Sequence, residues 1–410
     1  MSKRLPSNVG LMAILSISFV SMAFTATTPA MGALIAKFGA EVGQNVSLLS
    51  NAHILTLVPV TLLSGWFTNS GKLKFKTATL IGSLLMLIGG VGPAVLGEAS
   101  TFIIIIIFKL IFGIGLGLLT PLANALILNH YEGDKQARYL GWVTLLMNFG
   151  GILFQMLGGI LVDANAASGW YMHFWAYALC FPPIILSFFI PEPETQAPAA
   201  ASTNGPKEKI GAIVIIAGIF LFMINLFNYP VMMYMSALFG ERMIGGEAAA
   251  TTAATALSLF TVAGVVAGAV YGKLFGLLKR FILPTGFILM GIGGGLIYLA
   301  QDALLATVGC VFLGFGFSLI MPSFMSLVGM KTPPSRATMA TSIVLAIMNL
   351  GAIVVTPYLS VLEGFVSTPL ALYELILIIE VIGLISIGIL FIFWNLYPKA
   401  PAGESASSDN

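Results

Sequence analysis

The sequence predicts an all-α integral membrane protein with twelve transmembrane helices in two parallel six-helix pseudo-repeats around a central cavity. Composition and an internal repeat support this fold class. Hydrophobic residues make up 58% of the 410 residues, charged residues make up 8%, and the mean hydropathy is +1.00. No soluble fold of this length could bury so much apolar surface, so the chain is expected to lie in a bilayer.

The internal repeat has an offset of 201 residues. The segment Gly113–Pro121 begins with Gly-Ile-Gly and matches Gly314–Pro322, which begins with Gly-Phe-Gly. Met147–Gly150 matches Met348–Gly351 at the same offset. Because the repeated units are apolar, they predict two similar membrane bundles, an architecture of many secondary transporters with the solute site between the bundles.

Apolar segments long enough to cross about 30 Å of hydrocarbon define the twelve expected spans. They are 9–29, 46–67, 76–96, 101–128, 137–161, 171–190, 210–236, 250–272, 281–300, 304–329, 337–359 and 370–396. We therefore expect an N-terminal bundle at 1–190, a flexible linker at 191–209, a C-terminal bundle at 210–397 and a disordered tail at 398–410.

The basic residues predict the orientation. With the N-terminus in the cytoplasm, fifteen of the 18 Lys and Arg residues fall on the cytoplasmic side. This asymmetry predicts a multi-pass protein of the plasma membrane with both termini in the cytoplasm.

Two loops and one span carry motifs. Gly65–Lys74 follows the second span with Asn69, Gly71 and Lys72 among its residues, and its counterpart after the eighth span contains Gly268, Gly272 and Lys273. In the fourth span, glycines at 113, 115 and 117 follow Lys109.

Together with the topology, these motifs make almost the whole chain resemble the major facilitator superfamily. The family's loop pattern is G-x-L-x-D-R-x-G-R-K, and Asn69 stands where Asp is usual; Lys109 stands where the fourth-span pattern has Arg. The resemblance implies gating loops at Gly65, Asn69, Gly71, Lys72, Gly268, Gly272 and Lys273. Their basic groups would interact with helix C-termini when the cytoplasmic side closes. Orientation and contact with anionic lipids are an equally good interpretation of the lysines.

The resemblance also implies that spans one, four, seven and ten line the cavity. Polar and soft side chains on these spans, and on spans five and eleven, are the candidate substrate-binding residues. They are Lys109, Thr25, Thr120, Asn124, Asn148, Gln155, Asn225, Asn228, Tyr229, Met321, Met325 and Asn349. A helical count of 100° per residue places Lys109, Gly113, Thr120 and Asn124 within an arc of roughly 80°.

Three ionisable residues within the spans are candidates for proton coupling: Lys109, Glu380 and His53. A basic group inside a span is costly unless it is paired or faces water, so Lys109 is expected to bind a solute carboxylate or a proton, or else to shape the bundle. Glu380 lies in the peripheral twelfth span, where packing competes with proton carriage. A lone His is more often structural than functional.

These features favour a secondary active transporter that moves a small organic solute by alternating access, with coupling to protons. A single cavity cation favours an organic anion or zwitterion. The alternatives are efflux of amphipathic drugs by proton antiport and a non-transporting solute sensor. The spacing of His, Cys and acidic residues predicts no metal site, no cofactor and no catalytic site, so the chain is not expected to be an enzyme. We expect a monomer in the lipid bilayer that binds no nucleic acid.

Overall fold

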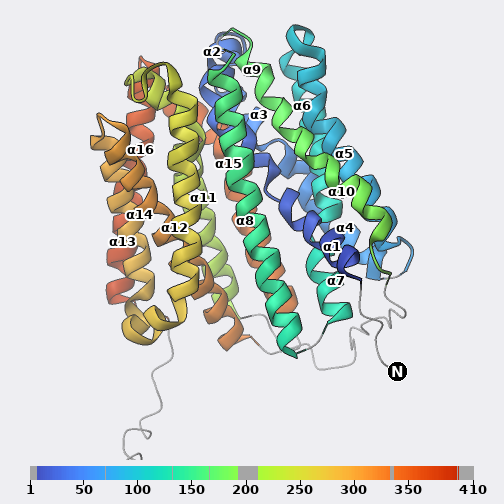
Figure 1. Cartoon of the computed structure of the whole chain (residues 1–410). Coiled ribbons are helices and arrows are strands. Elements are labelled where there is room, and N and C mark those ends of the chain that lie inside the picture. The colour runs from blue at the N-terminus through green and yellow to red at the C-terminus, as the bar shows by residue number, and fades with distance from the viewer. Residues whose placement is uncertain are drawn as a thin grey trace, which may run out of the picture.

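In the computed structural model, the described residues are 7–69, 71–131, 133–165, 167–192, 211–332, 337–394 and 396. Within these residues the chain is helical throughout, as the composition predicts (Figure 1). The expected linker, apart from residues 191 and 192, and the expected tail at 398–410 lie outside the described residues, so the domain boundaries stay a prediction.

The first half of the chain forms ten α-helices, with short 3-10 segments between several of them. Their bounds are α1 Asn8–Val20, α2 Met31–Val42, α3 Leu48–Asn51, α4 His53–Asn69, α5 Phe75–Leu96, α6 Phe102–Leu119, α7 Leu122–His130, α8 Gly133–Asp163, α9 Gly169–Met172 and α10 Phe181–Leu186. The 3-10 segments that matter below are η1 Ala23–Ala30, η2 Gly43–Ser47, η4 His173–Cys180 and η5 Ser187–Phe189.

The second half has longer, less interrupted helices. Their bounds are α11 Ala212–Glu241, α12 Ala249–Leu278, α13 Ile282–Leu299, α14 Ala303–Lys331, α15 Ala337–Glu363 and α16 Pro369–Phe393, with the 3-10 segment η6 Gly246–Ala248 before α12.

The helices account for the expected spans. Ten apolar helical stretches within the described residues are long enough to cross a membrane. Two of them, Asn8–Gly65 with 58 residues and Gly246–Leu299 with 54, are too long for one crossing. Each contains two of the spans expected from the sequence, which gives twelve.

Glycines bring neighbouring helices together in the same way in both halves. A Cβ on Gly82 of α5 would lie 3.0 Å from the carbonyl oxygen of Gly115 in α6, and a Cβ on Gly286 of α13 would lie 3.0 Å from the carbonyl oxygen of Gly316 in α14. Such contacts leave no room for a larger side chain, so the backbones pack directly. The repeat read from the sequence is therefore a repeat of helix packing.

The first and fourth spans differ from expectation. The first span was expected to end at residue 29, but η1 leads directly into α2, which continues to Val42. The fourth span was expected to be one helix, but it is interrupted by a turn at Thr120 and Pro121. In the second half, α14 continues through Pro322, so the two halves differ at this pair of prolines.

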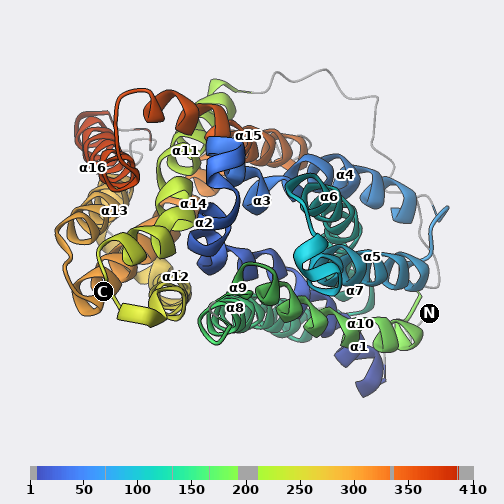
Figure 2. The same ribbon diagram turned by 90° about the horizontal axis from the view of Figure 1, so that it is seen from above.

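The two halves meet along a small set of helices. Figure 2 shows α8 beside α12 and α2 beside α11, and α15 packs against η2 and α3. We call the end of the bundle where α1 begins and α16 ends the terminal face, and the opposite end the distal face; in Figure 1 the distal face is at the top.

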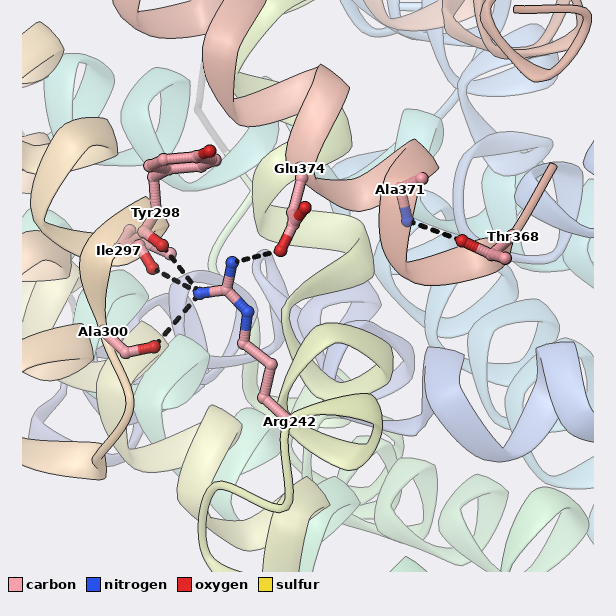
Figure 3. Close-up of polar contacts among 7 residues, drawn as sticks. All are labelled: Arg242, Ile297, Tyr298, Ala300, Thr368, Ala371 and Glu374. Atoms are coloured by element: carbon pink, nitrogen blue, oxygen red, sulfur yellow. Dashed lines mark hydrogen bonds and ion pairs between the residues drawn. The ribbon is translucent and has the colours of Figure 1, made fainter. Parts of the chain in front are cut away.

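Arg242 joins three helices of the second half at the distal face (Figure 3). Its guanidinium donates to the carbonyl oxygens of Ile297, Tyr298 and Ala300 at distances of 2.8–3.2 Å, and to Glu374 at 2.9 Å. Carbonyls at a helix C-terminus lack amide partners in the next turn, and although Ile297 also accepts from the Ala300 amide at 3.2 Å, the cation satisfies this end of α13 and ties the end of α11 to α13 and α16.

We expect Arg242→Ala to lower the free energy of unfolding by about 2–3 kcal/mol, because several part-buried acceptors lose a charged donor. Thermal unfolding in detergent measures the change. The control is Lys37→Ala, which removes an exposed pair with Glu98 and should cost less than about 1 kcal/mol. Equal shifts for the two variants would contradict this role of Arg242.

Candidate functional site

Lys109 lies at the centre of a buried polar cluster in the first half. Its side chain is only 1% exposed, and its ammonium donates to Thr27 Oγ1 at 2.6 Å and to the Tyr177 hydroxyl at 2.9 Å. The rings of Tyr177 and Phe174 lie 5.1 and 5.3 Å from Nζ. Among the described residues no carboxylate forms a salt bridge with Lys109, so hydroxyls and aromatic faces surround the cation.

Two buried histidines face the same lysine. His53 in α4 and His173 at the start of η4 both interact electrostatically with Lys109. Within the described part of the chain, Nδ1 of His53 and both ring nitrogens of His173 make no hydrogen bond of good length and angle, although backbone groups of Ser50 and of Gly169 and Trp170 lie near the two rings. The site is therefore rich in groups that can accept a proton and contains no described acid. His53 was a sequence candidate, whereas His173 was missed because no motif or spacing marks it.

The cluster lies close to the second half of the chain. The Thr27 and Tyr177 hydroxyls are 2.8 Å apart, and Tyr177 also lies within electrostatic interaction range of Tyr229 in α11. Tyr229 in turn pairs with the side chain of Ser50 in α3. The electrostatic interaction between the two tyrosines thus links the surroundings of Lys109 to the boundary between the halves.

Hydrogen bonds between the halves gather toward the distal face. Ser47 and Thr356 hydroxyls are 2.6 Å apart, and Asn51 donates to the Ala352 carbonyl at 2.9 Å. Further bonds join Tyr234 to Gln44 at 2.6 Å and the Gly32 amide to Ser236 at 2.9 Å. All these contacts join α2, η2 or α3 to α11 or α15.

Asp163 makes a charged contact across the same boundary. It ends α8, and its two carboxylate oxygens accept from the backbone amides of Ala250 at 3.3 Å and Thr251 at 2.6 Å, at the start of α12. A carboxylate at a helix N-terminus satisfies free N–H groups and complements the helix dipole. The first half therefore supplies the N-terminal cap for a helix of the second half.

Two hollows lie between the halves near the distal face. One, of about 320 Å³, is lined by residues that include Gln44, Tyr234 and Glu363. The other, of about 430 Å³, is lined by residues that include Asp163, Ser236 and Glu241. None of the expected substrate-binding residues lines either hollow.

The other candidates from spans one, five and eleven make mostly local contacts. Thr25 donates to Gly151 of α8 at 3.1 Å. Asn148 and Asn349 each donate 2.9 Å bonds to the carbonyl four residues earlier in their own helix. This shared geometry agrees with their equivalence in the repeat. Gln155 accepts from Ser258 across the α8–α12 contact at 3.4 Å.

The remaining candidates differ in burial. Asn225 donates to Met348 of α15 at 2.9 Å, and Asn228 is buried with an amide oxygen that lacks a partner among the described residues. Met321 and Met325 are half-buried. Thr120 and Asn124 are exposed, unlike Lys109, so the helical arc expected to unite them is broken at the turn after α6.

For the expected gating loops, the informative observations are the backbone conformation and the space around the glycines. Gly71 has a φ of +70°, a conformation that favours glycine. Additional atoms at Gly65, Gly268 or Gly272 would meet no described neighbour within 4 Å, so these glycines are not required by close packing here. Nothing is described of the Asn69 side chain, and the gating role of these loops stays a prediction.

The fold is that of a membrane transporter built from two similar bundles. The model of the Major Facilitator Superfamily matches residues 13–356 and 214–409. The chain belongs to this family of transporters, as the sequence motifs indicated.

Curated relatives match the chain only in part. It is 26% identical over 177 residues to Multidrug resistance protein 3 of Bacillus subtilis (strain 168), covering 43% of this chain and 32% of the relative. It is 25% identical over 203 residues to Multidrug efflux pump SdrM of Staphylococcus aureus (strain N315), covering 49% of this chain and 44% of the relative. The match therefore spans less than half the length of either relative.

Solved structures share the fold over almost the whole chain. A point mutant of the nucleoside transporter NupG has a TM-score of 0.77 at 12% identity and covers 94% of this chain and 99% of its own. The inward open conformation of the xylose transporter XylE from E. coli has a TM-score of 0.70 at 14% identity and covers 96% of this chain and 97% of its own. At these identities the likeness establishes the fold alone.

If the Asp163 contact holds the distal face closed, Asp163→Ala should open it. A cysteine placed at Ser258, which is 6% exposed, would then react about tenfold faster with an impermeant thiol reagent added on the distal side. Cys180 and Cys310 are both buried, so background labelling should be low.

The matched control is Asp302→Ala. Asp302 caps the N-terminus of α14 at 2.9 Å, but both groups lie within the second half. Its loss should cost about 1 kcal/mol of stability without faster labelling. Equal acceleration by both variants would indicate general loosening and not a contact between the halves.

Proposed function

We propose that this transporter is a secondary active transporter of the plasma membrane, with both termini in the cytoplasm. It moves a small organic solute by alternating access and couples that movement to protons. In this orientation the distal face is extracellular, and the hydrogen bonds gathered there make the present conformation inward-facing. The assignment of the distal face to the outside, and with it the inward-facing conformation, depends on the cytoplasmic excess of basic residues.

The observation that carries the coupling proposal is the burial of Lys109 without a described anionic partner. An unpaired ammonium in an apolar interior is costly, and the cost falls when it binds an anion or gives up its proton. Either anion binding or loss of the proton removes the cost of the buried charge. During the transport cycle, one can therefore replace the other at Lys109. The electrostatic interaction of Tyr177 with Tyr229 offers a route by which this exchange alters the boundary between the halves.

The favoured solute is an organic anion or zwitterion, because a carboxylate would complement the one described buried lysine of the first half. Efflux of amphipathic drugs is the second candidate. It is favoured by the names of the curated relatives and by half-buried Met321 and Met325, whose flexible side chains suit varied apolar ligands.

Purified protein in proteoliposomes with an imposed pH gradient tests the proposal. The probes are benzoate as an organic anion, leucine as a zwitterion and ethidium as an amphipathic cation. We expect benzoate or leucine to accumulate and an uncoupler to abolish the accumulation. Accumulation of ethidium alone would favour the second candidate, and binding without flux for all three would favour a solute sensor.

Lys109→Gln should reduce proton-driven accumulation about tenfold or more, since charge-assisted hydrogen bonds contribute about 1.5–3 kcal/mol each. Lys109→Arg should keep solute binding, because it keeps the charge, but lose coupling, because guanidinium does not release its proton. Lys37→Gln, which changes an exposed lysine, is the control. Wild-type coupling in Lys109→Gln would remove Lys109 from the mechanism.

A further inference from the structure

Glu380 is a carboxylic side chain buried inside the second half. It lies in α16 with 0% of its surface exposed, and neither carboxyl oxygen has a hydrogen-bond partner among the described residues. No Lys, Arg or His of the described chain forms an ion pair with it. An ionised carboxylate in this setting would cost several kcal/mol, so the group is most stable here as the neutral acid.

The repeat places Glu380 where the first half has Tyr177. A Cβ added to Gly90 of α5 would overlap the Tyr177 side chain, and one added to Gly294 of α13 would lie 2.9 Å from Oε2 of Glu380. Gly90 and Gly294 are 204 residues apart. Gly82 and Gly286, which make equivalent contacts with α6 and α14, are separated by the same offset. The two side chains thus occupy corresponding places in the two halves.

The residue next to Tyr177 in the first half also differs from the residue next to Glu380 in the second. Lys109 corresponds to Cys310 at the offset of 201, and both are buried. In the first half the lysine donates to the tyrosine hydroxyl, whereas in the second half the Cys310 thiol interacts electrostatically with Glu380 and no hydrogen bond joins them among the described residues. At this place the first half therefore has a lysine beside a tyrosine, and the second half has a carboxylic acid beside a cysteine.

The helices around Glu380 bring no charged group to it within the described chain. Tyr358 of α15 and Cys310 of α14 are the titratable groups that interact with it, and α13 contributes Gly294. From α11, the ring of Phe227 would lie 2.7 Å from a Cβ on Gly383, one turn along α16. Because α11 also packs against α2 of the first half, a change in the contacts between the halves would change what surrounds the acid.

We propose that Glu380 is a second proton-binding site, which holds its proton in the present conformation and exchanges it with water in another conformation of the cycle. The step is the binding of one proton to a carboxylate oxygen and its later release, and no other bond changes. This inference rests on the proposed coupling to protons, deepens it, and places an independent proton site in the second half.

Infrared difference spectroscopy of the full-length protein during a pH titration tests the protonation directly, with the proton itself as the probe. The wild type should show the C=O stretching band of a buried protonated carboxyl group, and Glu380→Gln should lack it. Glu380→Asp should restore an acid band at a shifted frequency, and Glu247→Gln, at an exposed position, should leave the wild-type band unchanged. Retention of the band in Glu380→Gln would overturn the proposal.

Flux in proteoliposomes then tests the role in coupling, using whichever of benzoate, leucine and ethidium the wild type accumulates. Glu380→Gln should retain exchange of labelled for unlabelled solute but lose proton-driven accumulation. Wild-type accumulation in Glu380→Gln would overturn this role. If the wild type itself accumulates none of the probes, the proposed function fails, and the infrared result still decides whether Glu380 holds a proton.

Discussion

Direct backbone packing between neighbouring helices is the constraint on which the rest of the structure depends. Gly82 against Gly115 and Gly286 against Gly316 bring two helix pairs so close that neither pair can slide without a clash. Because the hydrocarbon region contains no water, helices there associate by close packing, and this packing holds each half together. We therefore expect the halves to move as units, with the contacts between them setting which face is closed.

The contacts between the halves are of a different kind. Near the distal face they are hydrogen bonds such as Ser47 to Thr356 and the capping of α12 by Asp163, each of which water could replace once the face opens. Inside each half, by contrast, a group that is costly to bury in its charged form lies away from these contacts, Lys109 in the first half and Glu380 in the second. Proton-driven rocking of the halves would require both features: hydrogen bonds at the boundary that water can replace, and groups within the halves that can gain or lose a proton.

The sequence predicted the fold because apolar composition and a 201-residue repeat constrain it strongly. It also singled out Lys109 as a candidate site residue, since a lysine within a span is costly. It could not predict the surroundings of that lysine. The helical count assumed a continuous fourth helix, but the turn at Thr120 separates Lys109 from Asn124. Thr27, Tyr177 and His173 come from distant segments that only tertiary packing brings to Lys109, and no local pattern marks them.

Rigid-body motion of the halves can be measured by pulsed spin-label distances as the pH or solute is changed. Labels at exposed positions 135 and 277 would span the two halves toward the terminal face, labels at 37 and 247 would span them at the distal face, and labels at 37 and 135 would lie within the first half. The first distance should shorten as the second lengthens, while the third stays constant. A change in the third distance with the other two fixed would contradict motion of the halves as units.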